Sequence, residues 1–146
     1  MARRRRARPK RPRKGRGREP DAYRADAERL AREFVDTVAQ RWGARLGDDL
    51  DAVRVLDRVL EYVRDENAEE LLLPAGFYFG ELLRRAYGGH YAWSPLRKAL
   101  GLRFRGLVLY PLETVRRRVE QPGARPLEHV LLVLAKQLSE RDDSPP

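Results

Sequence analysis

Apolar residues recur at three- and four-residue steps over the first half of the chain, and this period predicts helices. Asp21 after Pro20 is the expected start of a helix whose stripe comprises Tyr23, Ala27, Leu30, Phe34, Val38 and Trp42. Gly43 and Gly47 interrupt the pattern. A second helix, capped by Asp48 or Asp49, is predicted from Val53, Leu56, Val59, Leu60, Tyr62 and Val63. We interpret the two helices as an antiparallel hairpin.

Residues 74–93 are predicted to organise the rest of the chain. Pro74 suits the first turn of a helix, and Gly88-Gly89 suits a left-handed end just after Tyr87. Gly76 and Gly80 lie one turn apart and share a helix face. Each glycine costs a helix about 1 kcal/mol relative to alanine. We therefore expect another backbone to approach closely at this face.

Two or three short antiparallel strands are predicted after the central helix. The first covers His90 to Trp93, and the strongest strand pattern is Leu102 to Tyr110, with a bulge or tight turn at Gly106. Residues 107–110 are expected to be buried on both faces, and residues 96–100 to form a helical turn or an irregular link. A sheet this small needs helices packed on one face.

Two helices are predicted to close the chain. Pro111 begins the first, with Leu112, Val115 and Val119 facing inward, and the second has a stripe of Leu127, Val130, Leu131, Leu134 and Leu138. The fold class is therefore α+β: a helical hairpin and a glycine-rich central helix on a small antiparallel sheet, followed by two helices. We expect one domain over residues 20–140 and a frayed end over residues 141–146.

Composition narrows the class of protein. The 146 residues are 42% hydrophobic, which suffices for one core, and contain no cysteine, which excludes disulfides, thiolate metal sites and cysteine nucleophiles. No stretch is apolar enough for a membrane span, and the arginine-rich start lacks the apolar segment of a signal peptide. We expect a cytoplasmic protein.

The net charge of +9 comes from the N-terminus. Residues 1–18 hold eleven basic residues and no acid, so the other 128 residues carry −2. We expect residues 1–19 to be a disordered tail that binds nucleic acid or an acidic membrane surface through its cations. The same composition also fits a GC-rich genome or a misplaced start codon. The candidate binding residues are Arg3, Arg4, Arg5, Arg6, Arg8, Lys10, Arg11, Arg13, Lys14, Arg16 and Arg18.

Glu81 is the residue that raises a question of chemistry, because apolar side chains flank it. Burial would raise its pKa and suit it to general acid–base catalysis, with His90 as a second candidate. The alternative, which we favour, is an ion pair with Arg84 or Arg85 or with a more distant arginine among residues 116–118, or a hydrogen bond to the following loop. Neither a phosphate-binding glycine loop nor a G-x-S-x-G elbow is present, and two distant histidines predict no metal site and no cofactor.

Several of these residues together resemble a group of small uncharacterised bacterial domains. The shared pattern is G-x-Y-x-G-E, a glycine pair, a tryptophan strand, and a proline-started helix with V-x-x-R. It covers about residues 70–138, and its positions here are Gly76, Tyr78, Gly80, Glu81, Gly88, Gly89, Trp93, Pro111, Val115 and Arg118. The resemblance implies a compact α+β domain and no established chemistry.

The sequence therefore supports three hypotheses of function. The first is a non-catalytic domain that binds a macromolecular partner, an unknown protein above all. The second is a nucleic-acid-associated protein that binds through its tail. The third is a hydrolase-like enzyme that uses Glu81 and His90.

Overall fold

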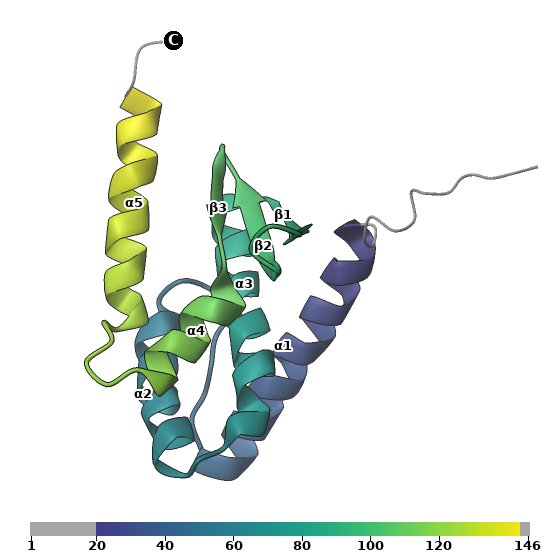
Figure 1. The fold of residues 1–146 in the computed structure, drawn as a ribbon. Helices are drawn as coiled ribbons and strands as arrows, with labels where there is room; N and C mark the ends of the chain where they lie inside the picture. Colours follow the sequence, from purple (N-terminus) through teal and green to yellow (C-terminus); the bar gives the residue numbers. More distant parts are fainter. Residues whose placement is uncertain (1–19, 144–146) are drawn as a thin grey trace, which may run out of the picture.

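The computed structural model describes residues 20–143, so the predictions for the basic tail and for the last three residues lie outside the described part. Over this range the chain folds into an α+β structure, as predicted (Figure 1). In order, its elements are α1 (Pro20–Trp42), α2 (Ala52–Asp65), the 3₁₀ turn η3 (Glu69–Leu71), α3 (Leu72–Tyr87), β1 (His90–Ser94), β2 (Ala99–Phe104), β3 (Leu107–Leu109), α4 (Pro111–Glu120) and α5 (Leu127–Asp143).

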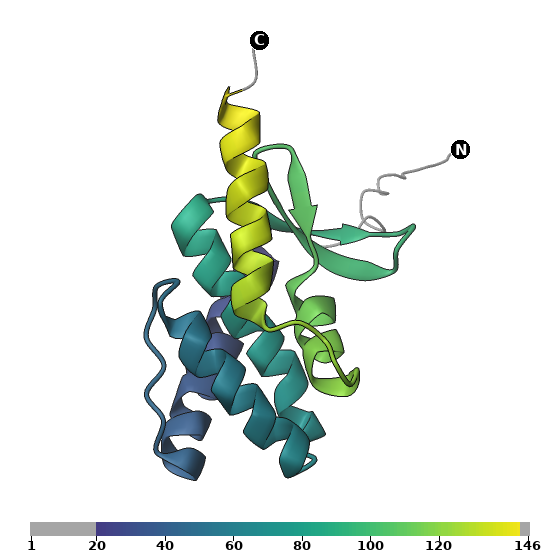
Figure 2. The same ribbon diagram turned by 90° about the vertical axis from the view of Figure 1, so that its left-hand side faces the viewer.

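The first two helices follow the predicted stripes, but each packs mainly on other elements. α1 packs along α3 and also contacts β1, whereas α2 contacts α4 and α5. Figures 1 and 2 show α3 running through the middle of the helices, with the sheet beside its C-terminal half.

The predicted N-caps of the first two helices differ from the structure. The first helix already includes Asp21, and α2 begins at Ala52, while the Asp49 carboxylate accepts the Asp51 N–H at 3.1 Å.

The central helix matches its prediction closely. α3 contains Pro74 in its first turn and ends at Tyr87, and Gly88 and Gly89 then take φ angles of 82° and 100°. A Cβ at Gly76 would lie 2.8 Å from Cα of Leu112, so the start of α4 does approach this face as closely as expected. Packing with α1, α4 and the sheet buries ten residues of α3, including Phe79, Leu82 and Leu83.

The sheet has the order β1-β2-β3 and is antiparallel throughout. The predicted long strand is divided, because Arg105 and Gly106 both adopt positive φ (51° and 76°) and form a tight turn. Residues 95–98 form a turn, and β2 begins earlier than predicted, at Ala99. The expected burial of residues 107–110 on both faces is wrong, since Val108 is 43% exposed.

The C-terminal helices also follow their predicted patterns. Val115 and Val119 of α4 are buried, as are Leu127, Leu134 and Leu138 of α5. α5 continues to Asp143, a few residues past the predicted domain limit. Within residues 20–143 no helix has the length and apolar character needed to cross a membrane.

Candidate functional site

Glu81 is buried in the middle of the domain, with 1% of its surface exposed. The Arg84 guanidinium donates to both carboxylate oxygens, from Nη2 to Oε1 at 2.8 Å and from Nε to Oε2 at 3.0 Å. The Tyr91 hydroxyl donates to Oε2 at 2.8 Å. Both carboxylate oxygens of Glu81 therefore accept hydrogen bonds from the protein itself.

The pairing extends to a third element. Arg84 Nη2 also contacts Glu28 Oε2 at 3.3 Å, so α1, α3 and β1 are joined through Glu28, Arg84, Glu81 and Tyr91. The Arg84 side chain is 13% exposed, and that of Glu28 is 35% exposed. We refer to these four residues as the Glu81 cluster. It lies where the N-terminal half of α1 meets the sheet.

The electrostatics of the Glu81 cluster follow from burial and pairing. Burial raises the pKa of Tyr91 well above its usual range, and the neighbouring Glu81 carboxylate raises it further. The Glu81 hydrogen bond raises the pKa of Arg84, partly opposed by burial. Tyr91 is therefore a neutral donor and Arg84 a cation at every physiological pH.

Gly80 makes the contact between Tyr91 and Glu81 possible. A Cβ at Gly80 would lie 2.6 Å from the Tyr91 hydroxyl oxygen and 3.2 Å from Cγ of Pro111. The two glycines on this face therefore serve different neighbours, since Gly76 admits the α4 backbone and Gly80 admits a side chain. Sequence reasoning identified the glycine face and missed the tyrosine that uses it.

A cavity of about 370 Å³ adjoins the cluster between α1, α3 and the loop before α2. Tyr78 contributes to its wall and donates its hydroxyl to the Gly47 carbonyl, and burial raises the pKa of this phenol. Glu81 also lies in the wall, but its oxygens are bound to Arg84 and Tyr91. The carboxylate in the cavity wall is therefore already hydrogen bonded, and Glu81 exposes almost no surface to water.

His90 lies apart from this arrangement. It is exposed at the start of β1, opposite Arg103 of β2, whereas Tyr91 is the residue that points to Glu81. The structure thus places the two catalytic candidates in different surroundings, one buried and one open to solvent. Within residues 20–143, no three His, Cys, Asp or Glu side chains are grouped closely enough to hold a metal ion.

Arg118 is the second buried charged residue of the motif pattern. Its guanidinium contacts Asp57 Oδ1 at 3.1 Å and Glu61 Oε2 at 2.9 Å, both on α2. Asp57 also accepts the N–H groups of Leu127 (2.8 Å) and Glu128 (3.0 Å), so it caps the start of α5. The expectation that arginines of this helix would reach Glu81 is not met, because Arg118 turns toward α2.

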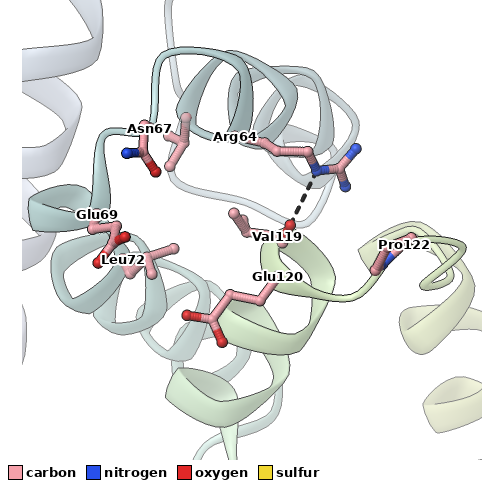
Figure 3. A pocket seen from close by; sticks show the side chains of 8 residues that line it. Arg64, Asn67, Glu69, Leu72, Val119, Glu120 and Pro122 are labelled. Atoms are coloured by element: carbon pink, nitrogen blue, oxygen red, sulfur yellow. Dashed lines mark hydrogen bonds between the residues drawn. The ribbon is translucent and has the colours of Figure 1, made fainter.

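A further pocket of about 310 Å³ lies between the ends of α2 and α4 (Figure 3). Its one cation, Arg64, donates from Nε to the Val119 carbonyl at 3.0 Å and from Nη2 to the Arg118 carbonyl at 3.1 Å. These contacts satisfy carbonyls at the C-terminal end of α4. Asn67, Glu69 and Glu120 complete the polar wall, and all three are exposed. Helix capping accounts for the position of Arg64 without a ligand.

The motif positions named from the sequence lie on α3, in the glycine pair after it, on β1 and on α4, and the basic tail residues lie outside the described part. Asp57 and Tyr91 were missed from the sequence. Asp57 has a sequence signal, since it lies next to the apolar stripe of α2 while Arg118 lies three residues after buried Val115 on α4. No family model, curated protein or solved structure matches this chain.

Proposed function

We propose that this chain is a non-catalytic domain that binds a macromolecular partner. The observation that supports this most is the state of Glu81, the strongest candidate for acid–base chemistry. A general acid or base must reach a substrate proton within hydrogen-bond distance. Glu81 is 1% exposed, and Arg84 and Tyr91 already bind its oxygens.

Exposed apolar side chains lie on β1 and in the turn that follows it, where a partner could contact them. Trp93 is 49% exposed on β1, and Leu96 is 96% exposed in the turn that follows. Exposed apolar side chains at a projecting turn favour contact with a partner over enclosure of a small substrate. The basic residues Arg97 and Lys98 in this turn support the second hypothesis, nucleic-acid association. The observation that still favours the hydrolase hypothesis is that Glu81 lies in the wall of a cavity.

The test is the stability of Glu81→Gln and Glu81→Ala by urea denaturation. If the carboxylate is structural, Glu81→Gln should be destabilised by roughly 1.5–3 kcal/mol, because charge-assisted hydrogen bonds are lost. Glu81→Ala should be destabilised more, because Arg84 and Tyr91 would lose their acceptor altogether. Catalytic residues often trade stability for function. Two variants as stable as the parent protein would therefore refute the proposal and favour the hydrolase.

A further inference from the structure

Positive charge in the folded part is concentrated in the sheet and α4. Residues 88–120 contain seven basic residues and two acidic residues, Glu113 and Glu120. Residues 20–87 contain ten basic and fifteen acidic residues, so the helical half is negative. The net charge of the folded part is therefore near zero because a positive region and a negative region offset each other. One of these basic residues, Arg118, is buried and pairs with Asp57 and Glu61 of α2.

The β1–β2 hairpin carries the most exposed part of the positive region. Figure 2 shows this hairpin projecting away from the helices. Its turn, residues 95–98, presents Leu96 at 96% exposure, followed by Arg97 and Lys98. A leucine so fully exposed at a projecting turn contributes nothing to the core. It is free to contact a partner.

Two cations of the hairpin are available for a partner. Lys98 and Arg103 are exposed and form no ion pair among residues 20–143. By contrast, Arg97 pairs with Glu113 and lies over the Tyr110 ring at 4.3 Å, and Arg105 pairs with Asp142 at 3.6 Å. Arg103 faces outward beside His90 and Val108 in the sheet register, opposite the side that Tyr91 and Leu102 bury.

We propose that the β1–β2 hairpin is an arm that binds duplex DNA, with Lys98 and Arg103 on phosphates and Leu96 inserted between base steps. This inference rests on the proposed function and names the class of partner. Lysine and arginine supply the phosphate contacts that dominate DNA affinity. A two-stranded ribbon fits a DNA groove, and leucine is among the side chains that serve as wedges between base pairs.

The composition of the N-terminal segment agrees with this arm. Residues 1–18 carry eleven cations and join the fold through the beginning of α1. α1 contacts β1, and Figure 1 shows its first turns on the same side as the sheet. Nine of the eleven cations are arginines, whose guanidinium group binds phosphate in a bidentate manner. The chain therefore carries a second group of cations, which directly precedes the helix that contacts β1.

The phosphate contacts can be tested by fluorescence anisotropy of a short labelled duplex with the full chain, titrated at several KCl concentrations. The variant is Lys98→Gln with Arg103→Gln. Its control is Arg58→Gln with Lys136→Gln, which removes two exposed charges from α2 and α5. Loss of two phosphate contacts should lower the slope of log affinity against log salt by about 1.8. The control pair should leave the slope unchanged. Equal slopes for the two pairs would overturn the proposal.

The wedge needs a separate readout, the bend of the duplex, measured by energy transfer between dyes on its two ends. Leu96→Ser should abolish the bend and keep the salt slope, whereas Leu132→Ser, which changes a 67% exposed leucine on α5, should alter neither. An unchanged bend in Leu96→Ser overturns the wedge.

Two other partners are outcomes of the same experiment. Tighter binding to the single strand of the same sequence would overturn the duplex assignment. So would tighter binding to phosphatidylserine vesicles that is lost in Leu96→Ser. None of these results depends on the stability of the Glu81 variants, so this proposal and the proposed function can fail separately.

Discussion

The Tyr91 hydroxyl occupies the space that a side chain at Gly80 would fill, since a Cβ there would lie 2.6 Å from the phenol oxygen. From this position the hydroxyl donates to Glu81, the next residue of α3. The glycine is therefore needed for a polar contact between a helix and a strand. Its backbone conformation is an ordinary helical one.

Gly80→Ala should therefore destabilise the fold, although alanine is the better helix former by about 1 kcal/mol. The new methyl group must displace the Tyr91 phenol, and overpacking of this kind costs roughly 1–3 kcal/mol before the lost hydrogen bond is counted. Urea denaturation measures the change. Gly47→Ala is the control for the added methyl group alone, because Gly47 lies in a loop and a Cβ there meets nothing within 4 Å. Greater stability in Gly80→Ala would show that Tyr91 does not need this space.

Asp57→Asn should be among the more damaging conservative substitutions in the helical half. The carboxylate pairs with Arg118, whose side chain is 8% exposed, and caps α5 through two N–H groups. Removing one partner of a buried pair costs about 3–5 kcal/mol, and we expect roughly 2–3 kcal/mol because Arg118 keeps Glu61.

The control for Asp57→Asn is Glu33→Gln, which breaks an exposed bridge to Arg29 and should change the free energy of unfolding by less than about 1 kcal/mol. Similar values for the two variants in thermal or urea unfolding would contradict a structural role for the α2–α4–α5 junction.

Stability should fall at alkaline pH because two tyrosines are held neutral. Burial raises the pKa of both Tyr78 and Tyr91 above the usual value. In the unfolded chain these phenols ionise near pH 10, so above that pH the unfolded state binds fewer protons than the folded state. Their contribution is complete below about pH 10 and is lost as the pH rises further.

Phenolate absorbance during a pH titration checks this directly. Of the six tyrosines, Tyr78 and Tyr91 should ionise only together with the loss of circular dichroism. The variant Tyr78→Phe, Tyr91→Phe should lose that late phase. Ionisation of all six phenols before any unfolding would contradict the burial of these two hydroxyls.

The sequence predicted the parts of this fold whose signals are local. Pro74, the Gly76–Gly80 face and the Gly88-Gly89 end all lie within one helix, so one periodic segment contained the information. The β2–β3 turn was predicted only as one of two alternatives at Gly106, because an arginine, Arg105, takes one of its two positive φ angles. Positive φ is uncommon outside glycine, so Gly106 alone indicated only a bulge or a turn.

The contacts that define the Glu81 cluster are long-range, and they could not be read from periodicity. Arg84 was a predicted partner because it lies one helical turn from Glu81. Tyr91 was not, because its contact depends on how β1 packs beside α3. The pair Asp57–Arg118 likewise joins residues 61 positions apart. Sequence patterns singled out Arg118 and Glu81 as motif positions. Their partners, Asp57 and Tyr91, could be identified only from the packing of the elements.

The most direct test of the central claim, that Glu81 is a structural carboxylate, is a double-mutant cycle of Glu81→Gln and Tyr91→Phe by urea denaturation. Residues in one hydrogen-bond network couple by about 0.5–3 kcal/mol. We predict that the two single variants are each destabilised and that the double variant loses less than their sum, with a coupling of at least about 1 kcal/mol. Additive effects, with Glu81→Gln as stable as the parent protein, would contradict the account.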